Sequence, residues 1–175
     1  MAKTKWNLDP THSELGFKVK HMMITNVSGS FRSFNANVET EDDDFSTANI
    51  EFTIDVASIN TGNEQRDGHL KSGDFFDVEN HPQMKFVSTG VAKKGDDEFE
   101  ISGDLSLHGV TKTVTFKAEN GGSGKDPWGN HKTGFTLEGK IKRTDFGLNW
   151  NAALEAGGVL VSEDVKINGE LQLTR

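Results

Sequence analysis

Cysteine is absent from the 175 residues of the sequence. Its absence excludes disulfide bonds, thiol catalysis and metal sites built on cysteine. The sequence also lacks an apolar run of about 18 residues, so we expect no transmembrane helix. Residues 1–6 contain no apolar signal segment. We therefore expect a cytoplasmic protein, or a periplasmic one if an upstream signal peptide has been removed.

An excess of positive charge is absent as well. Lys and Arg number 19 against 27 Asp and Glu, which gives a formal net charge of −8. Binding to a nucleic-acid backbone requires concentrated Lys and Arg, and docking on anionic membranes has the same requirement. We therefore expect neither nucleic acid nor an anionic membrane surface as a partner.

Recognisable catalytic and metal-binding motifs are also missing. None of the six histidines shows H-x-x-x-H or H-E-x-x-H spacing, and no G-x-S-x-G segment is present. His108 and His131 fall at expected turns, where a hydrogen bond to the backbone is the simplest role. The acidic residues 39–44 lack the ligand spacing of an EF-hand and fit a solvated turn. We therefore expect no catalytic residue, no metal site and no cofactor.

Apolar residues make up only 33% of the chain, but they alternate with polar ones along much of it. Such alternation is typical of strands that bury one face. It predicts strands over residues 14–20, 27–38, 50–56, 84–91, 99–107, 114–116, 135–141 and 165–173. The Gly-rich residues 120–130 are expected to form an exposed, mobile connection. We predict one all-β domain over residues 1–175, an up-and-down antiparallel barrel of eight strands. A two-sheet sandwich is the alternative.

Two details of these strands concern the barrel interior. Phe31 and Phe34 have opposite parity, so a bulge between them is expected if both face inward. Gly103, Gly139 and Gly169 fall at inward positions, where a missing side chain bends the strand or leaves internal space. An eight-stranded barrel is wide enough to be filled by side chains or to hold one slender ligand. An apolar lining would favour a lipid tail.

Residues 61–86 interrupt the strand pattern. Thr61 and Glu64 fit a capping box, which predicts that a short helix begins there. The adjacent Phe75 and Phe76 follow this helix. A short helix with two aromatic residues, inserted in an all-β chain, is expected to close one end of the barrel.

The same helix presents two cationic side chains, Arg66 and His69, on one face. In one interpretation they pair with nearby carboxylates and brace the closure. In the other they lie at a cavity mouth and bind a polar head group. The first interpretation is favoured, because buried polar groups need partners in any case.

Along nearly its whole length the sequence resembles the YceI-like, polyisoprenoid-binding proteins. The resemblance rests on Trp6-x-Leu8-Asp9-x-x-His12-Ser13, Phe17-x-Val19-x-His21, Ser28-Gly29-Ser30-Phe31, Ile59-x-Thr61-Gly62-Asn63, Arg66-Asp67-x-His69-Leu70-Lys71-Ser72-x-Asp74-Phe75-Phe76-Asp77-Val78, Gly103-Asp104-Leu105, His108-Gly109-Val110-Thr111 and Arg143-x-Asp145-Phe146-Gly147-Leu148. It implies a lipocalin-like, eight-stranded barrel around a long apolar channel, with a short helical insertion closing one end. It also implies binding of an isoprenoid or other long amphiphile, and no catalytic residue to transfer.

The leading hypothesis is a protein that carries or sequesters a polyisoprenoid, an isoprenoid quinone or a fatty-acid derivative. The residues expected to line the channel are Phe17, Val19, Phe31, Phe52, Ile54, Phe75, Phe76, Phe86, Leu105, Phe116, Phe135 and Leu137. The cations available for a polar head group are Arg66, His69, Arg32 and Arg143. The alternatives are a lipid-modifying enzyme that uses the same cavity, and a stress-related interaction module without a ligand. A homodimer is compatible with the sequence but nothing in it requires one.

Overall fold

The computed structural model describes residues 2–151 and 160–175, which form one antiparallel sheet of eleven strands. The strands are β1 (Lys3–Leu8), β2 (Glu14–His21), β3 (Thr25–Phe31), β4 (Phe34–Glu41), β5 (Asp44–Asp55), β6 (Ile59–Asn60), β7 (Gln83–Lys93), β8 (Glu98–Leu107), β9 (Val110–Lys125), β10 (His131–Lys142) and β11 (Val161–Thr174). The helices are η1 (Pro10–His12), η2 (Val56–Ser58), α1 (Glu64–Lys71) and η3 (Arg143–Phe146).

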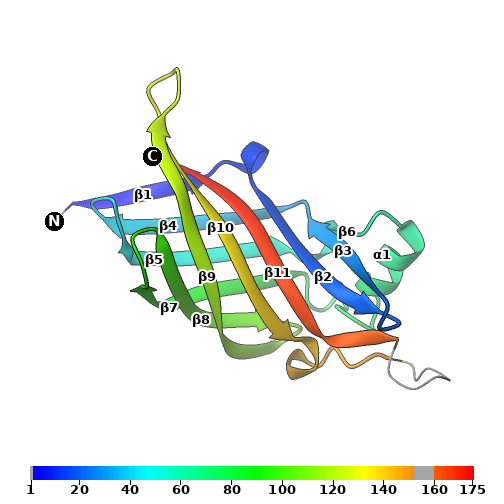
Figure 1. The fold of residues 1–175 in the computed structure, drawn as a ribbon. Helices are drawn as coiled ribbons and strands as arrows, with labels where there is room; N and C mark the ends of the chain where they lie inside the picture. Colours follow the sequence, from blue (N-terminus) through cyan, green and yellow to red (C-terminus); the bar gives the residue numbers. More distant parts are fainter. Residues whose placement is uncertain (1, 152–159) are drawn as a thin grey trace.

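The sheet closes on itself because β1 pairs with two partners. It pairs with β4 on one side, where Trp6 is opposite Val38, and with β11 on the other, where Leu8 is opposite Leu173. The closed ring is β1, β4, β5, β7, β8, β9, β10 and β11 (Figure 1). The eight-stranded antiparallel barrel predicted from the sequence is therefore confirmed.

The strand expected over residues 27–38 is broken into two segments. The strand expected over 14–20 lies within β2 and that expected over 50–56 lies within β5 up to Asp55, and each is separated from a further short strand by a helix. The helix η1 separates β1 from β2, two residues separate β3 from β4, and η2 separates β5 from β6. Asp9 and Asp55 cap the two short helices, since their side chains accept hydrogen bonds from the backbone N–H of Thr11 and Ala57. The irregularity expected between Phe31 and Phe34 is thus a complete strand break.

The three strands outside the closed ring, β2, β3 and β6, continue the barrel from β11 at the end where α1 lies (Figure 1). At this end β6 pairs with β3, and β7 pairs with β5 and β8. Within the described residues no backbone ladder joins β6 to β7. The chain between them, which carries α1, spans this interval.

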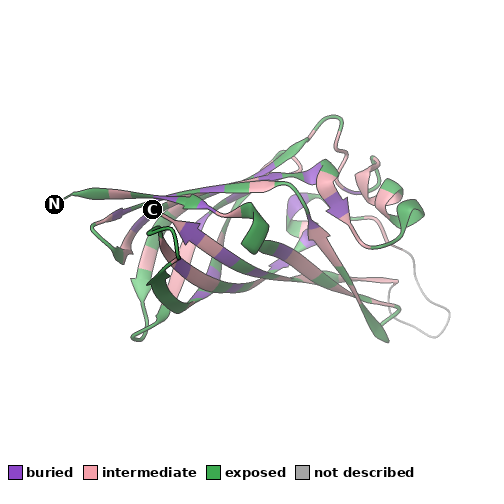
Figure 2. Cartoon of the chain, turned by 90° about the horizontal axis from the view of Figure 1, so that it is seen from above, coloured by how far each residue is buried: buried purple, intermediate pink, exposed green. Residues whose placement is uncertain are grey.

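Buried and more exposed residues alternate along the strands, as the coloured bands in Figure 2 show. Buried apolar side chains form one cluster that runs from Trp6 and Leu173 through Phe52 to Leu105 and Phe146. The contrast between a buried and an exposed face is what the period-2 pattern predicts.

The inward glycines do not leave empty space. A Cβ atom built on Gly139 would lie 2.8 Å from Cε1 of Phe116, and one on Gly103 would lie 2.6 Å from Cζ of Phe86. Each glycine therefore lets an aromatic ring of the neighbouring strand lie across it, as in the aromatic rescue of strand glycines. The expectation of free volume at these two positions is wrong, because the rings occupy it.

The Gly-rich stretch also differs from its prediction. Strand β9 continues to Lys125, which pairs with His131, so only residues 126–130 form the connection to β10. Asp126 organises this turn, because its carboxylate accepts hydrogen bonds from the backbone N–H of Trp128 and Asn130. Glycine has low strand propensity, but the ladder that β10 offers overrides it.

The helix α1 begins later than the capping-box pattern suggested. Its cap is Asn63, whose side-chain oxygen accepts a hydrogen bond from the backbone N–H of Arg66 at 3.0 Å. Thr61 instead donates from its hydroxyl and backbone N–H to the Asp67 carboxylate. The predicted capping box is therefore wrong, although the expected helix exists and lies at one end of the barrel.

Candidate functional site

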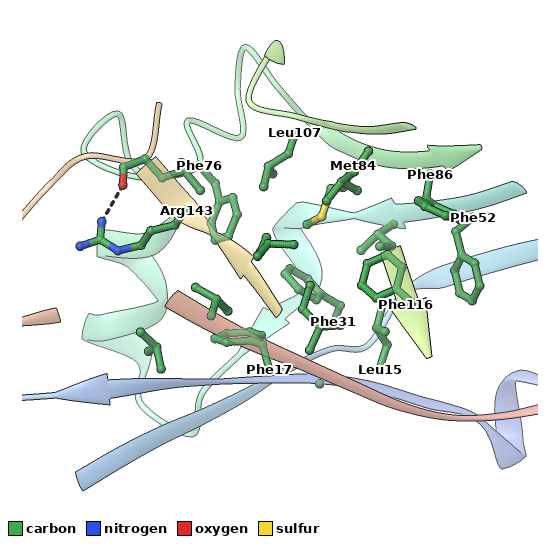
Figure 3. Close-up of a pocket in the computed structure, with 18 of the residues that line it drawn as sticks. Leu15, Phe17, Phe31, Phe52, Phe76, Met84, Phe86, Leu107, Phe116 and Arg143 are labelled. Carbon is green, nitrogen blue, oxygen red and sulfur yellow. Dashed lines mark hydrogen bonds between the residues drawn. The ribbon is translucent and has the colours of Figure 1, made fainter. Parts of the chain in front are cut away.

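An apolar cavity of about 150 Å³ lies inside the barrel. Strand side chains form most of its wall, while Leu70, Phe75 and Phe76 reach it from α1 and the turns that follow (Figure 3). A smaller chamber of about 50 Å³ adjoins it. Both chambers are lined by Ile50, Phe52, Ile101 and Leu137. The interior is therefore hollow and hydrophobic along part of the barrel axis.

Aromatic rings are the main packing units of the wall. The ring of Phe31 lies 5.6 Å from that of Phe17 and 6.2 Å from that of Phe76, measured between centroids. Phe86 and Phe116 form another pair at 5.4 Å with an edge-to-face geometry. Such pairs contribute beyond the area they bury, so they fix the shape of the cavity.

The side chains expected to line a channel are brought together by the fold. All of them except Phe135 line the larger cavity, and Phe135 lines the smaller chamber. The wall also contains residues that sequence reasoning did not select: Leu15, Ile50, Leu70, Met84, Ile101, Leu107, Ile141, Leu148, Val161, Val165 and Ile167. Strand parity could have identified those on strands, whereas Leu70 and Leu148 lie outside strands and gave no periodic signal.

Arg143 is the one charged residue in the cavity wall formed by residues 2–151 and 160–175. It is only 4% exposed. Its Nη1 donates to the carbonyl oxygens of Leu148 at 2.6 Å and Trp150 at 3.0 Å. Its Nε and Nη2 donate to the carbonyls of Ser162 and Val161 at 2.8 and 3.2 Å. The guanidinium therefore joins the chain after η3 to the start of β11.

Burial lowers the pKa of the Arg143 guanidinium from its ordinary value, and the charge of Glu163 partly offsets this. An arginine side chain nevertheless stays protonated in proteins. The aromatic ring of Phe75 lies 6.0 Å from the guanidinium carbon and adds a cation–π contact. The cavity wall thus contains a positive charge that backbone carbonyls and an aromatic ring solvate.

The other three candidate head-group cations do not line the cavity. Arg66 donates from Nε and Nη2 to the hydroxyl and carbonyl of Thr61. His69 bonds to the Asp74 carboxylate at 2.9 Å, and Arg32 is exposed. The four cations therefore form no single cluster.

A closed eight-stranded antiparallel barrel around an apolar cavity defines a lipocalin-like class of protein. The model of the YceI-like domain family matches residues 6–173, so the chain belongs to this family. UPF0312 protein SAS2572 of Staphylococcus aureus (strain MSSA476) is 41% identical over 172 residues, which cover 98% of each chain. None of the described helices is long and apolar enough to span a membrane.

Solved structures share the fold. BcnA of Burkholderia cenocepacia superimposes with a TM-score of 0.82 at 25% identity, covering 94% of this chain and 98% of BcnA. The YceI protein of Campylobacter jejuni gives 0.78 at 34% identity, with 96% of each chain covered. A polyisoprenoid binding domain from Saccharophagus degradans gives 0.70 at 18% identity, covering 96% of this chain and 97% of that one. At that identity the last similarity concerns the fold alone.

Proposed function

We propose that this protein binds the tail of a long-chain amphiphile inside the barrel and thereby carries or sequesters it. The observation that supports this is the apolar cavity of about 150 Å³, with Phe75 and Phe76 in the wall at the α1 end. Each buried CH₂ group contributes about 0.8 kcal/mol, so a hydrocarbon tail gains affinity along its whole length. A polyisoprenoid, an isoprenoid quinone and a fatty-acid derivative all carry such a tail.

The tail would contact the aromatic and aliphatic side chains of the two chambers. In this proposal the contacts in the larger cavity are Phe17, Val19, Phe31, Phe52, Ile54, Phe75, Phe76, Phe86, Leu105, Phe116 and Leu137. Phe135 would meet the tail in the smaller chamber. Tail length would then be limited by how far the two chambers connect.

The polar end of the ligand would meet Arg143. Its Nη2 donates one of two N–H groups to Val161, and the other has no hydrogen-bond partner among residues 2–151 and 160–175. One remaining donor suits a neutral carbonyl oxygen, such as that of a quinone or an amide, better than a pyrophosphate, which needs several. Arg66 and His69 already use Thr61 and Asp74, which also favours a neutral head group.

The experiment is extraction of the purified protein under native conditions, followed by lipid mass spectrometry. We expect at least one long-chain isoprenoid, quinone or fatty amide, and rebinding of the same compound to delipidated protein. Recovery of no lipid, together with no binding of any of these three classes, would refute the proposal. The variant Arg66→Ala distinguishes a head group bound at Arg143 from one bound at Arg66. If it binds at Arg143, we expect no change in affinity for a prenyl alcohol or its pyrophosphate. A selective loss for the pyrophosphate would place the head group at Arg66 instead.

Binding is proposed rather than catalysis within the cavity. A lipid-modifying enzyme would need an acid–base pair near the tail. The part of the cavity wall that the structure describes carries Arg143 as its titratable side chain and no carboxylate or histidine. An interaction module without a ligand would be expected to fill the barrel with its own side chains, and the hollow interior argues against it.

A further inference from the structure

Three potential metal ligands meet outside the cavity. Asp77 and His81 belong to the connection between α1 and β7, and His108 lies in the turn between β8 and β9. Their ligand atoms all lie within 4.8 Å of one another, and all three residues are half-buried. A cluster that unites two distant segments and combines two imidazoles with one carboxylate differs from a chance group of surface acids.

The hydrogen bond of His108 prepares its ring for coordination. Nδ1 lies 3.2 Å from the carbonyl oxygen of Phe146. A carbonyl can only accept, so Nδ1 must carry a proton, and in the neutral ring Nε2 keeps a free lone pair. In metal-binding histidines, the ring nitrogen that does not bind the metal usually donates its N–H to a backbone carbonyl, a carboxylate or water.

The other two residues are held in a compatible way. The Oδ2 atom of Asp77 accepts a hydrogen bond from the Asn80 side chain at 2.9 Å, which fixes the carboxylate and leaves Oδ1 available. The rings of His81 and His108 lie 4.8 Å apart between centroids. Gly109 makes room for His81, because a Cβ atom there would lie 2.9 Å from Cε1 of that ring. His81 has no side-chain hydrogen bond within the described part of the chain, so its ring nitrogens are free to coordinate.

We propose that Asp77, His81 and His108 bind a divalent transition-metal ion of the zinc class. Imidazole nitrogen suits Zn²⁺, Ni²⁺ and Cu²⁺, whereas Mg²⁺ and Ca²⁺ require oxygen ligands throughout. Tetrahedral zinc lies about 2.1 Å from each ligand, which places ligand atoms about 3.4 Å apart. Small side-chain rotations close the remaining separation. Three protein ligands leave one coordination position for water or another ligand.

The ion would join three parts of one barrel end. Asp77 directly follows Phe76 of the cavity wall, His108 belongs to the β8–β9 turn, and Phe146 links His108 to η3. Bound metal would therefore tie the α1 closure to the strands. This proposal does not depend on the identity, or even the existence, of a lipid ligand.

The test is calorimetric titration of chelator-treated protein with ZnCl₂, repeated with CoCl₂ to record the visible spectrum of tetrahedral Co²⁺. We expect one ion per chain and at least tenfold weaker binding in His81→Ala and His108→Asn. Asparagine is chosen for His108 because this residue has a φ of 55°, which Asn tolerates. The control is His21→Ala at the end of β2, which should bind zinc as tightly as the unaltered protein.

Two further measurements, thermal unfolding and NMR, test the site even if a variant folds poorly. Zinc should raise the thermal midpoint of the unaltered protein and of His21→Ala, but not that of His81→Ala. In ¹⁵N NMR spectra of the imidazoles, zinc should shift His81 and His108 and leave the other histidines unchanged. Absence of zinc binding, equal binding by His81→Ala, or shifts confined to other histidines would each overturn the proposal.

Discussion

Replacement of Gly139 by alanine tests whether the glycines of the barrel make room for aromatic rings of the neighbouring strands. The new Cβ atom would lie 2.8 Å from Cε1 of Phe116, and closer still to Cδ1. Carbon atoms pack at about 3.5–4.0 Å, so the ring must move by about 1 Å. Phe116 already contacts Phe86 at 5.4 Å between centroids, which leaves the cavity as the direction of escape.

The expected cost of Gly139→Ala is about 1–3 kcal/mol of unfolding free energy, the range for overpacking a well-packed interior. Gly134→Ala is the matched control on the same strand. A new Cβ atom on Gly134 would lie 3.8 Å from the Leu171 carbonyl oxygen, which is an ordinary contact. We expect that control to change stability by less than about 1 kcal/mol. Urea unfolding measures both, provided that the slope of the transition stays constant.

A double-mutant cycle attributes the effect to the ring itself. Combining Gly139→Ala with Phe116→Leu removes the clash, so the two changes should be non-additive by about 0.5–3 kcal/mol. If Gly139→Ala lowers stability no more than Gly134→Ala does, or if the effects of Gly139→Ala and Phe116→Leu are additive, then Gly139 is not needed to make room for the Phe116 ring.

Three further predictions concern polar groups. Arg143→Met should lower the free energy of unfolding by about 3–5 kcal/mol, because the backbone carbonyls that accept hydrogen bonds from the guanidinium would lose their donors. A loss below about 1 kcal/mol in urea unfolding would contradict this. Asn63→Ala should cost about 1 kcal/mol by removing the helix cap, and equal hydrogen exchange of α1 amides in both proteins would refute the cap. Hydrogen bonds from Thr11 and His12 hold the pKa of Asp9 well below its usual range, so its contribution is complete above the unfolded pKa of about 3.9 and disappears as pH falls further. Asp9→Asn should accordingly be less stable than the unaltered protein at pH 7 and approach it at low pH, and a pH-independent difference would refute the linkage.

The strands were predictable where one face is buried throughout. Residues 50–56 and 99–107 alternate because each strand has the interior on one side and solvent on the other. The pattern failed over residues 120–125, since a Gly-rich exposed hairpin has no buried face to encode. It also joined β3 and β4 into one strand, and it did not predict β1 as a strand.

The apolar residues that line the cavity were easier to predict from the sequence than the polar groups around it. Phe52 and Leu105 follow strand parity into the cavity, whereas the position of Arg143 depends on carbonyls contributed by two separate segments. The proposed metal ligands illustrate the same limit. Asp77 and His81 are four residues apart and match none of the motifs considered, and His108 joins them only through the tertiary fold.

The break in pairing between β6 and β7 gives the molecule two regions of different local stability. Elsewhere around the barrel, separating two neighbours requires the loss of a row of backbone hydrogen bonds. Parting β6 from β7 breaks no ladder and disturbs chiefly the packing of α1 and the turns that carry Phe75 and Phe76. Local opening there therefore costs less free energy than global unfolding. Such an opening would leave the ladders between the remaining strands intact.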